Sequence, residues 1–205
     1  QQFGFVHDTE VGKSGFITAL YIVFVPIISL FLGRRGSPLL WAAVALSLVG
    51  LWFLCIPPEG FTIAAGDLFV LACAVVFSLH ILVIGRYVLL VDAVELSMMQ
   101  FFCGSILAFF AMLALESPTW IGWQTALPAM LWAGIMSNGI AYTLQIVGQR
   151  GMNDTTSSLI LSLESVFSVI SGWLILNEVL SMREGLGCVL MAAAVVLAQL
   201  PGNKR

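Results

Sequence analysis

Charged side chains are scarce in this sequence. They make up 9% of its 205 residues, whereas a soluble domain carries about 25%. Hydrophobic residues reach 60%, and the mean hydropathy is +1.04. These values exclude an ordinary soluble protein and predict an integral membrane protein. Runs of like charge are also absent, and the formal net charge is only -3, so we expect no nucleic-acid partner.

Signals for metals, cofactors and leader peptides are absent as well. Cys55, Cys73, Cys103 and Cys188 fall inside apolar segments without the spacing of metal ligands, so we interpret them as packing residues. We expect no metal site and no cofactor. The chain opens with Gln1 and shows no basic stretch ahead of an apolar core. No signal peptide is therefore visible, and we expect the natural N-terminus to lie upstream.

Seven apolar runs have about the 20 residues that a helix needs to cross a bilayer. They are residues 12–33, 38–57, 66–85, 96–115, 126–147, 154–177 and 182–200. Because the connections are short, no soluble domain is inserted. We predict an all-α polytopic membrane protein with seven visible transmembrane helices. Pro26 lies inside the first run, where we expect a mild kink.

The basic residues indicate how these helices are oriented. Successive spans alternate in direction, and this alternation gathers most of the lysines and arginines on one side of the membrane. That side carries Arg34, Arg35, Arg86, Arg150, Lys204 and Arg205. The other side carries Lys13 and Arg183. By the positive-inside rule, we predict a multi-pass protein of the cell (inner) membrane with a cytoplasmic C-terminus.

Two parts of the sequence resemble each other. Residues 12–53 align without gaps over residues 156–197, at an offset of 144 positions, so that Ser14 meets Ser158. By the predicted topology the first copy starts outside and the second starts inside. The two hairpins are therefore predicted to be inverted, which is the symmetry of many secondary transporters.

Glu164 lies near the middle of the sixth apolar run. A carboxylate there costs about 2.5 to 3.5 kcal/mol on insertion scales, so such a residue normally faces protein or a water-filled cavity. Ser157, Ser168 and Ser171 share its helix face at steps of three and four. We predict that Glu164 and Ser168 line a central cavity. Proton coupling through Glu164 is one hypothesis, and pairing with a substrate amine is another.

Further candidates lie in three other spans. His80 is the only histidine inside a predicted span. It is either a cavity residue or an interior polar group with its hydrogen bonds satisfied. Asn138 and Tyr142 share a polar helix face, which either lines the cavity or joins helices by hydrogen bonds. Thr18 and Tyr21 form the equivalent face of the first span by the internal repeat.

Several short motifs carry a resemblance to a known family. They are Ser14-Gly15-Phe16-Ile17-Thr18, Val25-Pro26, Gly33-Arg34-Arg35, Gly134 with Ala141-Tyr142, Leu163-Glu164-Ser165-Val166-Phe167, Gly172-Trp173-Leu174 and Asn177-Glu178. In these motifs the chain resembles the EamA-type transporters of the drug/metabolite transporter (DMT) superfamily. Ser165 stands where the family has proline, and Asn177 where it has glycine.

The resemblance implies a ten-helix transporter made of two inverted five-helix repeats (5+5). The seven visible helices then resemble helices 4 to 10. Residues 1–60 would be the remainder of the first EamA repeat, with two helices, and residues 61–205 the second repeat, with five. The implied function is a secondary transporter that exports small metabolites or amino acids by alternating access. Its partners are a small-molecule substrate and the lipid bilayer, and no residue is catalytic.

Two other classes of protein match parts of the sequence. The segment Gly12-Lys13-Ser14-Gly15 matches the Gly-x-Ser-Gly motif of rhomboid-like intramembrane serine proteases, with His80 as the base. The helix of His80 lacks the glycines that let the two helices of that family approach closely. A seven-helix receptor fits the number of spans, yet no span contains a lysine placed to hold retinal. The transporter remains the preferred interpretation.

Overall fold

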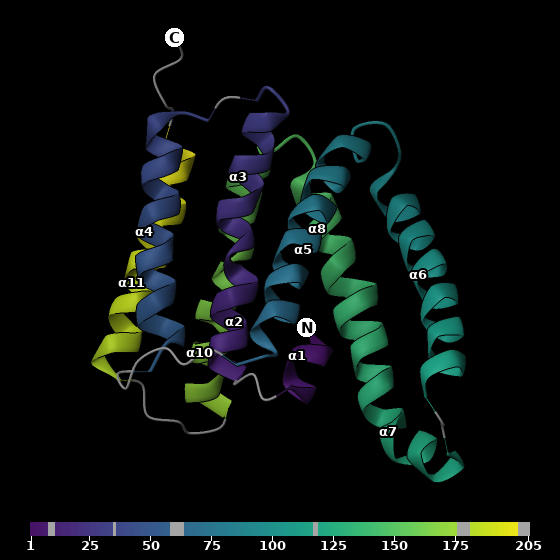
Figure 1. The fold of residues 1–205 in the computed structure, drawn as a ribbon. Helices are drawn as coiled ribbons and strands as arrows, with labels where there is room; N and C mark the ends of the chain where they lie inside the picture. Colours follow the sequence, from purple (N-terminus) through teal and green to yellow (C-terminus); the bar gives the residue numbers. More distant parts are fainter. Residues whose placement is uncertain (8–10, 35, 58–63, 117–118, 176–180, 201–205) are drawn as a thin grey trace. The chain divides into compact units, whose positions relative to one another are not determined.

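The computed structural model describes residues 1–7, 11–34, 36–57, 64–116, 119–175 and 181–200, and these ranges contain helices and no strands (Figure 1). Arg35, Asn177, Glu178, Lys204 and Arg205, which the topology and the motifs used, lie outside the described residues. The chain forms two compact units, Gln1–Leu82 with Asn153–Arg205, and Val83–Met152.

The first unit holds both copies of the internal repeat. Its helices are α1 (Gln2–Val6), α2 (Val11–Ala19), α3 (Tyr21–Phe31), α4 (Pro38–Cys55), most of α5 (Asp67–Tyr87), α9 (Asp154–Leu161), α10 (Leu163–Ile175) and α11 (Met182–Gln199). The second unit holds the end of α5, then α6 (Ala93–Leu115), α7 (Trp120–Trp132), the π-helix η1 (Ala133–Tyr142) and α8 (Thr143–Gln149).

Six helical stretches of the described residues are long and apolar enough to cross a membrane. They are Lys13–Phe31, Pro38–Cys55, Asp67–Tyr87, Ala93–Leu115, Asp154–Ile175 and Met182–Gln199. The predicted span 126–147 corresponds to the consecutive elements α7, η1 and α8. The structure therefore agrees with an all-α polytopic membrane protein, and the apolar runs of the sequence located its helices.

The two helices α4 and α11 begin in the same way. Ser37 precedes α4 and accepts a hydrogen bond from the backbone N–H of Leu40. Ser181 precedes α11 and accepts one from the backbone N–H of Glu184, which completes a capping box. Ser37 and Ser181 are 144 positions apart, and each helix has 18 residues. The offset found in the sequence thus relates the starts and the lengths of two helices.

The two hairpins run in opposite directions. In Figure 1, α2 and α3 rise and α4 descends, whereas α9 and α10 descend and α11 rises. The close packing of α4 against α11 agrees, because Gly187 lies beside both Gly50 and Leu54 while Gly50 also meets Met191. The predicted inversion of the two copies is therefore present within the first unit.

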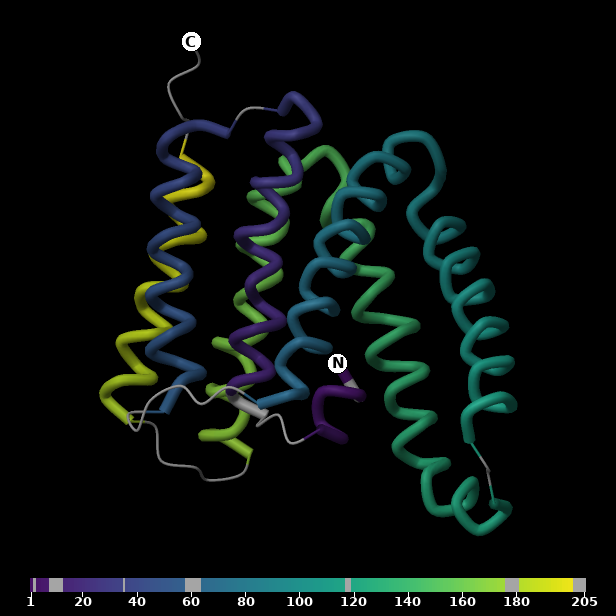
Figure 2. Tube along the Cα trace, in the orientation of Figure 1, coloured from purple at the N-terminus to yellow at the C-terminus, as the bar shows by residue number. Residues whose placement is uncertain are grey.

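Two predicted spans are each broken into two helices (Figure 2). The first break is at Leu20, whose N–H donates to the carbonyl of Ile17 and tightens the turn. Pro26, where a kink is expected from the sequence, lies six residues further on, inside α3. The second break is at Ser162, whose hydroxyl donates to the carbonyl of Leu159 at 2.7 Å. Such side-chain bonds compete with the helical ones.

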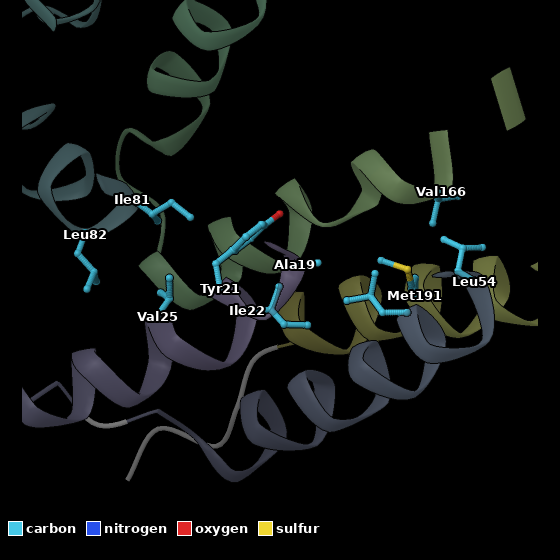
Figure 3. Close-up of a cluster of buried hydrophobic side chains, with 10 residues drawn as sticks. Ala19, Tyr21, Ile22, Val25, Leu54, Ile81, Leu82, Val166 and Met191 are labelled. Carbon is cyan, nitrogen blue, oxygen red and sulfur yellow. The ribbon is translucent and has the colours of Figure 1, made fainter. Parts of the chain in front are cut away.

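The core of the first unit joins both hairpins to α5. Its members come from α2, α3, α4, α5, α10 and α11 and are buried against one another (Figure 3). They are Ala19, Tyr21, Ile22, Val25, Leu51, Leu54, Ile81, Leu82, Val166 and Met191. A second cluster joins α4, α9 and α11 through Leu40, Ala43, Val44, Leu159 and Val195. Apolar burial therefore holds the inverted hairpins together.

The second unit is packed more sparsely. Ile84, Val88, Ala93 and Ile146 form its buried cluster, and most side chains of α6 and α7 are exposed. The prediction of a continuous α-helix over 126–147 is wrong in one respect, because Ala133–Tyr142 winds as a π-helix. Its hydrogen bonds reach five residues along the chain rather than four, so a polar face counted at α-helical spacing does not apply there.

Candidate functional site

The seven predicted site residues divide between the two units. Thr18, Tyr21, His80, Glu164 and Ser168 belong to the first unit, and Asn138 and Tyr142 belong to the second.

One aromatic side chain connects two of the candidates in the first unit. Phe77 of α5 meets the ring of Tyr21 edge-on, with centroids 5.1 Å apart and planes at 73°. Phe77 also stacks on the ring of His80, at 5.9 Å and 18°. Phe77 was not among the residues predicted from the sequence, although an aromatic residue one helical turn before His80 was a usable signal. Tyr21, Phe77 and His80 therefore form one aromatic group between α3 and α5.

Thr18 lies close to this group in the chain. It is in the last turn of α2, just before the break at Leu20. Its hydroxyl oxygen is buried and has no hydrogen-bond partner among the described residues. Leaving a buried polar group unpaired costs about 1 to 3 kcal/mol, and a polar partner that reached this hydroxyl would remove that cost.

Glu164 lies in the first turn of α10, just after the break at Ser162. The side chains of Glu164 and Ser168 are both exposed on the first unit. Val166, between them in the chain, instead belongs to the core together with Tyr21 (Figure 3). No hydrogen bond or ion pair to another described residue is found for Glu164. Its carboxylate is therefore free to meet water or a ligand.

The predicted polar face is buried in its first part and exposed in its second part. Ser157 of α9 is buried, whereas Glu164, Ser168 and Ser171 of α10 are exposed. The change coincides with the break at Ser162. The sequence predicted a single helix over residues 154–177, with the whole polar face on one side.

The two inverted hairpins are closer at one end than at the other. The C-terminal half of the first broken span, α3, packs against the N-terminal half of the second, α9. The symmetry-related halves are α2 and α10, and their described residues show no comparable packing. The exposed polar residues of α10 thus belong to the half of the pair that is less enclosed.

Each end of this arrangement also carries an ion pair. Arg34, after α3, bonds to Asp154 at the start of α9. Lys13 of α2 bonds to Asp67 at the start of α5, with Nζ and Oδ2 3.1 Å apart, and both side chains are largely buried. Neither pair was predicted, although the topology placed Arg34 and Asp154 on the same side of the membrane.

The remaining candidates lie in the second unit. Asn138 is exposed within η1. Tyr142 ends η1, and its ring meets that of Phe101 in α6 edge-on, with centroids 6.1 Å apart. The next residue, Thr143, bonds to Ser97 of α6 through their hydroxyl oxygens at 2.6 Å. Tyr142 is thus held against α6, whereas Asn138 is presented on an exposed helix.

Comparison with known proteins decides the family. The profile of the EamA-like transporter family matches residues 64–200. The chain belongs to this family. Membership confirms the EamA-type transporter of the DMT superfamily that the motifs indicated, and it makes the chain part of a multi-pass membrane protein of a transporter family. It also favours a transporter over the protease and receptor interpretations.

Two further proteins are similar over nearly the whole chain. An uncharacterized transporter of Archaeoglobus fulgidus (strain ATCC 49558 / DSM 4304 / JCM 9628 / NBRC 100126 / VC-16) is 31% identical over 202 residues, which are 94% of this chain. The chain spans 61% of that relative's length. A crystal structure of another protein, 22% identical in sequence, superposes with a TM-score of 0.79 over 98% of this chain and 72% of its own. At that identity the likeness concerns the fold.

No group of three or more histidine, cysteine, aspartate or glutamate side chains is placed to hold a metal ion within the part of the chain that the structure describes. The predicted site residues carry carboxylate, hydroxyl, imidazole and amide groups. These groups suit the binding of a small polar molecule through hydrogen bonds and ion pairs.

Proposed function

We propose that the whole protein to which this chain belongs is a secondary carrier of the cell (inner) membrane. It exports a small metabolite or an amino acid by alternating access. The observation that supports this most strongly is the pair of inverted hairpins, since carriers of many folds expose a central site to each side by moving inverted elements against one another. Residues 1–60 and 61–205 are then parts of the first and second EamA repeats.

The packing suggests which elements stay together during the cycle. Helices α4 and α11 touch along their backbones at Gly50 and Gly187, so they form the fixed centre. The broken helices, α2 with α3 and α9 with α10, change their mutual packing around that centre. The breaks at Leu20 and Ser162 let each half of a span move separately, because hinges form where the helical hydrogen bonds are interrupted.

Glu164 is the proposed anchor for the substrate. An exposed carboxylate on a membrane-spanning helix needs water or a partner of opposite charge, and the amine of an amino acid is such a partner. Ser168, one turn further along α10, and Thr18 supply hydroxyl groups for the polar remainder of the substrate. Tyr21 and His80, whose rings both contact Phe77, are proposed to line the same cavity. Asn138 and Tyr142 belong to the second unit, and their role in substrate binding stays a prediction from the sequence.

Proton coupling through Glu164 belongs to the same proposal. A carboxyl that binds a proton and the substrate in turn links efflux to the proton gradient. The orientation follows the basic residues. Arg34 and Arg86 mark the cytoplasmic side, and the C-terminus lies on that side.

The test is a counterflow assay with the full-length protein in proteoliposomes. Vesicles are loaded with one unlabelled amino acid or amine at a time, and uptake of the same radiolabelled compound is followed. Loaded vesicles that contain the protein are expected to accumulate at least one compound above protein-free vesicles. If a folded preparation accumulates none of the zwitterionic or cationic compounds, the proposed substrate class is wrong.

A further inference from the structure

The bond between Arg34 and Asp154 links the two hairpins directly. These residues are 120 positions apart in the chain. Arg34 follows the last turn of α3, and Asp154 opens α9. The bond therefore joins the end of one broken span to the beginning of its inverted counterpart, at the end where α3 and α9 pack together.

Helix caps hold both partners in place. After α3, Gly33 adopts a positive φ of 78°, which a residue with a side chain rarely accepts. Its N–H donates to the carbonyl of Leu30, and the N–H of Arg34 donates to that of Ser29, the pattern of a Schellman motif. On the other side, the side chain of Asn153 caps α9 by accepting from the N–H of Thr155. The two capped helix ends thus hold the side chains of Arg34 and Asp154 next to each other.

Burial makes this bond more consequential than an ordinary surface pair. The side chain of Asp154 is 9% exposed, while that of Arg34 is 50% exposed. A fully exposed ion pair contributes little to stability, but removing the partner of a largely buried carboxylate leaves an uncompensated charge. The C-terminal end of α3 and the N-terminal end of α9 also carry opposite partial charges. Every one of these contributions favours contact between the two helix ends.

The opposite end of the repeat does not offer the same bond. The offset of 144 positions maps Arg34 onto Glu178 and Asp154 onto Glu10. Both mapped residues are acidic, and both lie outside the described residues. These two positions therefore carry opposite charges at one end of the repeat and like charges at the other.

We infer that the Arg34–Asp154 pair is the latch of the gate that closes the α3–α9 end of the transport pathway. The inference rests on the proposed alternating access. In the state that the structure shows, the latch holds α3 against α9, whereas the described residues of α2 and α10 show no comparable packing. When the carrier turns over, the latch opens, and α9 becomes accessible to water from that side.

Cysteine accessibility measures this opening without any transported substrate. Ser157 of α9 is 4% exposed and lies one turn after Asp154. In the full-length protein with its native cysteines replaced by alanine, Ser157→Cys is labelled with a membrane-impermeant maleimide in inside-out vesicles. Arg34→Gln and Asp154→Asn are each expected to speed labelling by about fivefold. Arg34→Lys keeps the charge and is expected to retain most of the protection.

A double-mutant cycle separates the latch from a general loss of structure. If the two residues act through their bond, Arg34→Gln with Asp154→Asn labels no faster than either single variant. The inference would be overturned if the double variant labelled faster by the product of the two single effects. It would also be overturned if neither single variant labelled faster than the parent protein. Arg86→Gln is the matched control, because Arg86 is an exposed arginine of the last turn of α5 on the same predicted side. It is expected to leave labelling unchanged.

The labelling result and the counterflow result fail independently. If the double-mutant cycle gives the expected labelling rates but the protein transports nothing, the carrier proposal is wrong. The ion pair then remains a contact that closes the two hairpins against each other. A protein that transports but shows no labelling change in the latch variants would keep the carrier and remove the latch.

Discussion

Gly50 of α4 and Gly187 of α11 lie in direct backbone contact. A Cβ atom on Gly187 would lie 2.8 Å from the carbonyl oxygen of Gly50, and one on Gly50 would lie 3.0 Å from that of Gly187. The offset of 144 positions maps Gly50 onto Ala194 and Ala43 onto Gly187. Ala43 and Ala194 are fully buried as well. Small residues thus occupy both symmetry-related positions, and the inverted helices approach closely at their centre.

This contact predicts an unequal response to two similar substitutions in α11. Gly187→Ala places a methyl group against the backbone of α4, so α4 and α11 must separate and the thermal midpoint of the protein in detergent should fall. Gly185→Ala is the control, because a Cβ there meets nothing within 4 Å. It should be neutral or stabilise the helix by up to about 1 kcal/mol. Equal midpoints for the two variants would contradict the close approach.

The buried ion pair of Lys13 and Asp67 predicts a second asymmetry. Removing one partner, as in Lys13→Met, leaves a buried carboxylate and should cost about 3 to 5 kcal/mol. Asp67 also accepts a bond from the N–H of Ala64 at 2.8 Å, so Asp67→Leu should destabilise too. The double variant should be more stable than Lys13→Met alone. Thermal unfolding of the four proteins gives the comparison, and simple additivity would show that the pair is not coupled.

Phe77 is predicted to matter more than the aromatic residues of α6. Its partly buried ring touches both Tyr21 and His80, so Phe77→Ala should cost more than about 1 kcal/mol. Phe110→Ala is the matched control, because the Phe110 side chain is exposed on its unit. It should change stability by less than about 0.5 kcal/mol. Similar losses of thermal stability in both variants would argue against a structured aromatic group.

Glu164→Gln tests the proposed anchor and its protonation. The amide has the size of the carboxyl but neither its charge nor its proton exchange. The rate of counterflow should fall by about tenfold or more, because the substrate loses one hydrogen bond to a charged group. Any residual transport should no longer depend on a pH gradient. Glu95→Gln, at an exposed position in the first turn of α6, should behave like the unaltered protein. Unchanged rate and pH dependence in Glu164→Gln would remove the residue from the mechanism.

The sequence predicted those parts of the fold that depend on local composition and on repetition. Apolar runs located the membrane-spanning helices because each run must satisfy the bilayer by itself. The offset between residues 12–53 and 156–197 predicted the inverted hairpins, and Ser37 and Ser181 start equivalent helices. Both signals can be seen in the sequence without knowing which segments touch in the fold.

Features that arise from packing between distant segments were missed. Ser158 and Ser162 both donate to backbone carbonyls, yet the helix breaks at only one of them, so the break depends on its surroundings. The sequence of Ala133–Tyr142 has an apolar pattern that fits an α-helix equally well, so its π-helical winding was not predicted. The partnership of Arg34 with Asp154 required knowing that α3 packs against α9.

The opposed orientation of the two hairpins is the claim on which the transporter account depends, and labelling from each side of the membrane tests it most directly. Leu32, after α3, is 63% exposed, and Met182, at the start of α11, is 93% exposed. In the full-length, otherwise cysteine-free protein, an impermeant maleimide should label Met182→Cys from outside intact cells and Leu32→Cys only in inside-out vesicles. Labelling of both positions from the same side would contradict the inverted repeat and the carrier mechanism built on it.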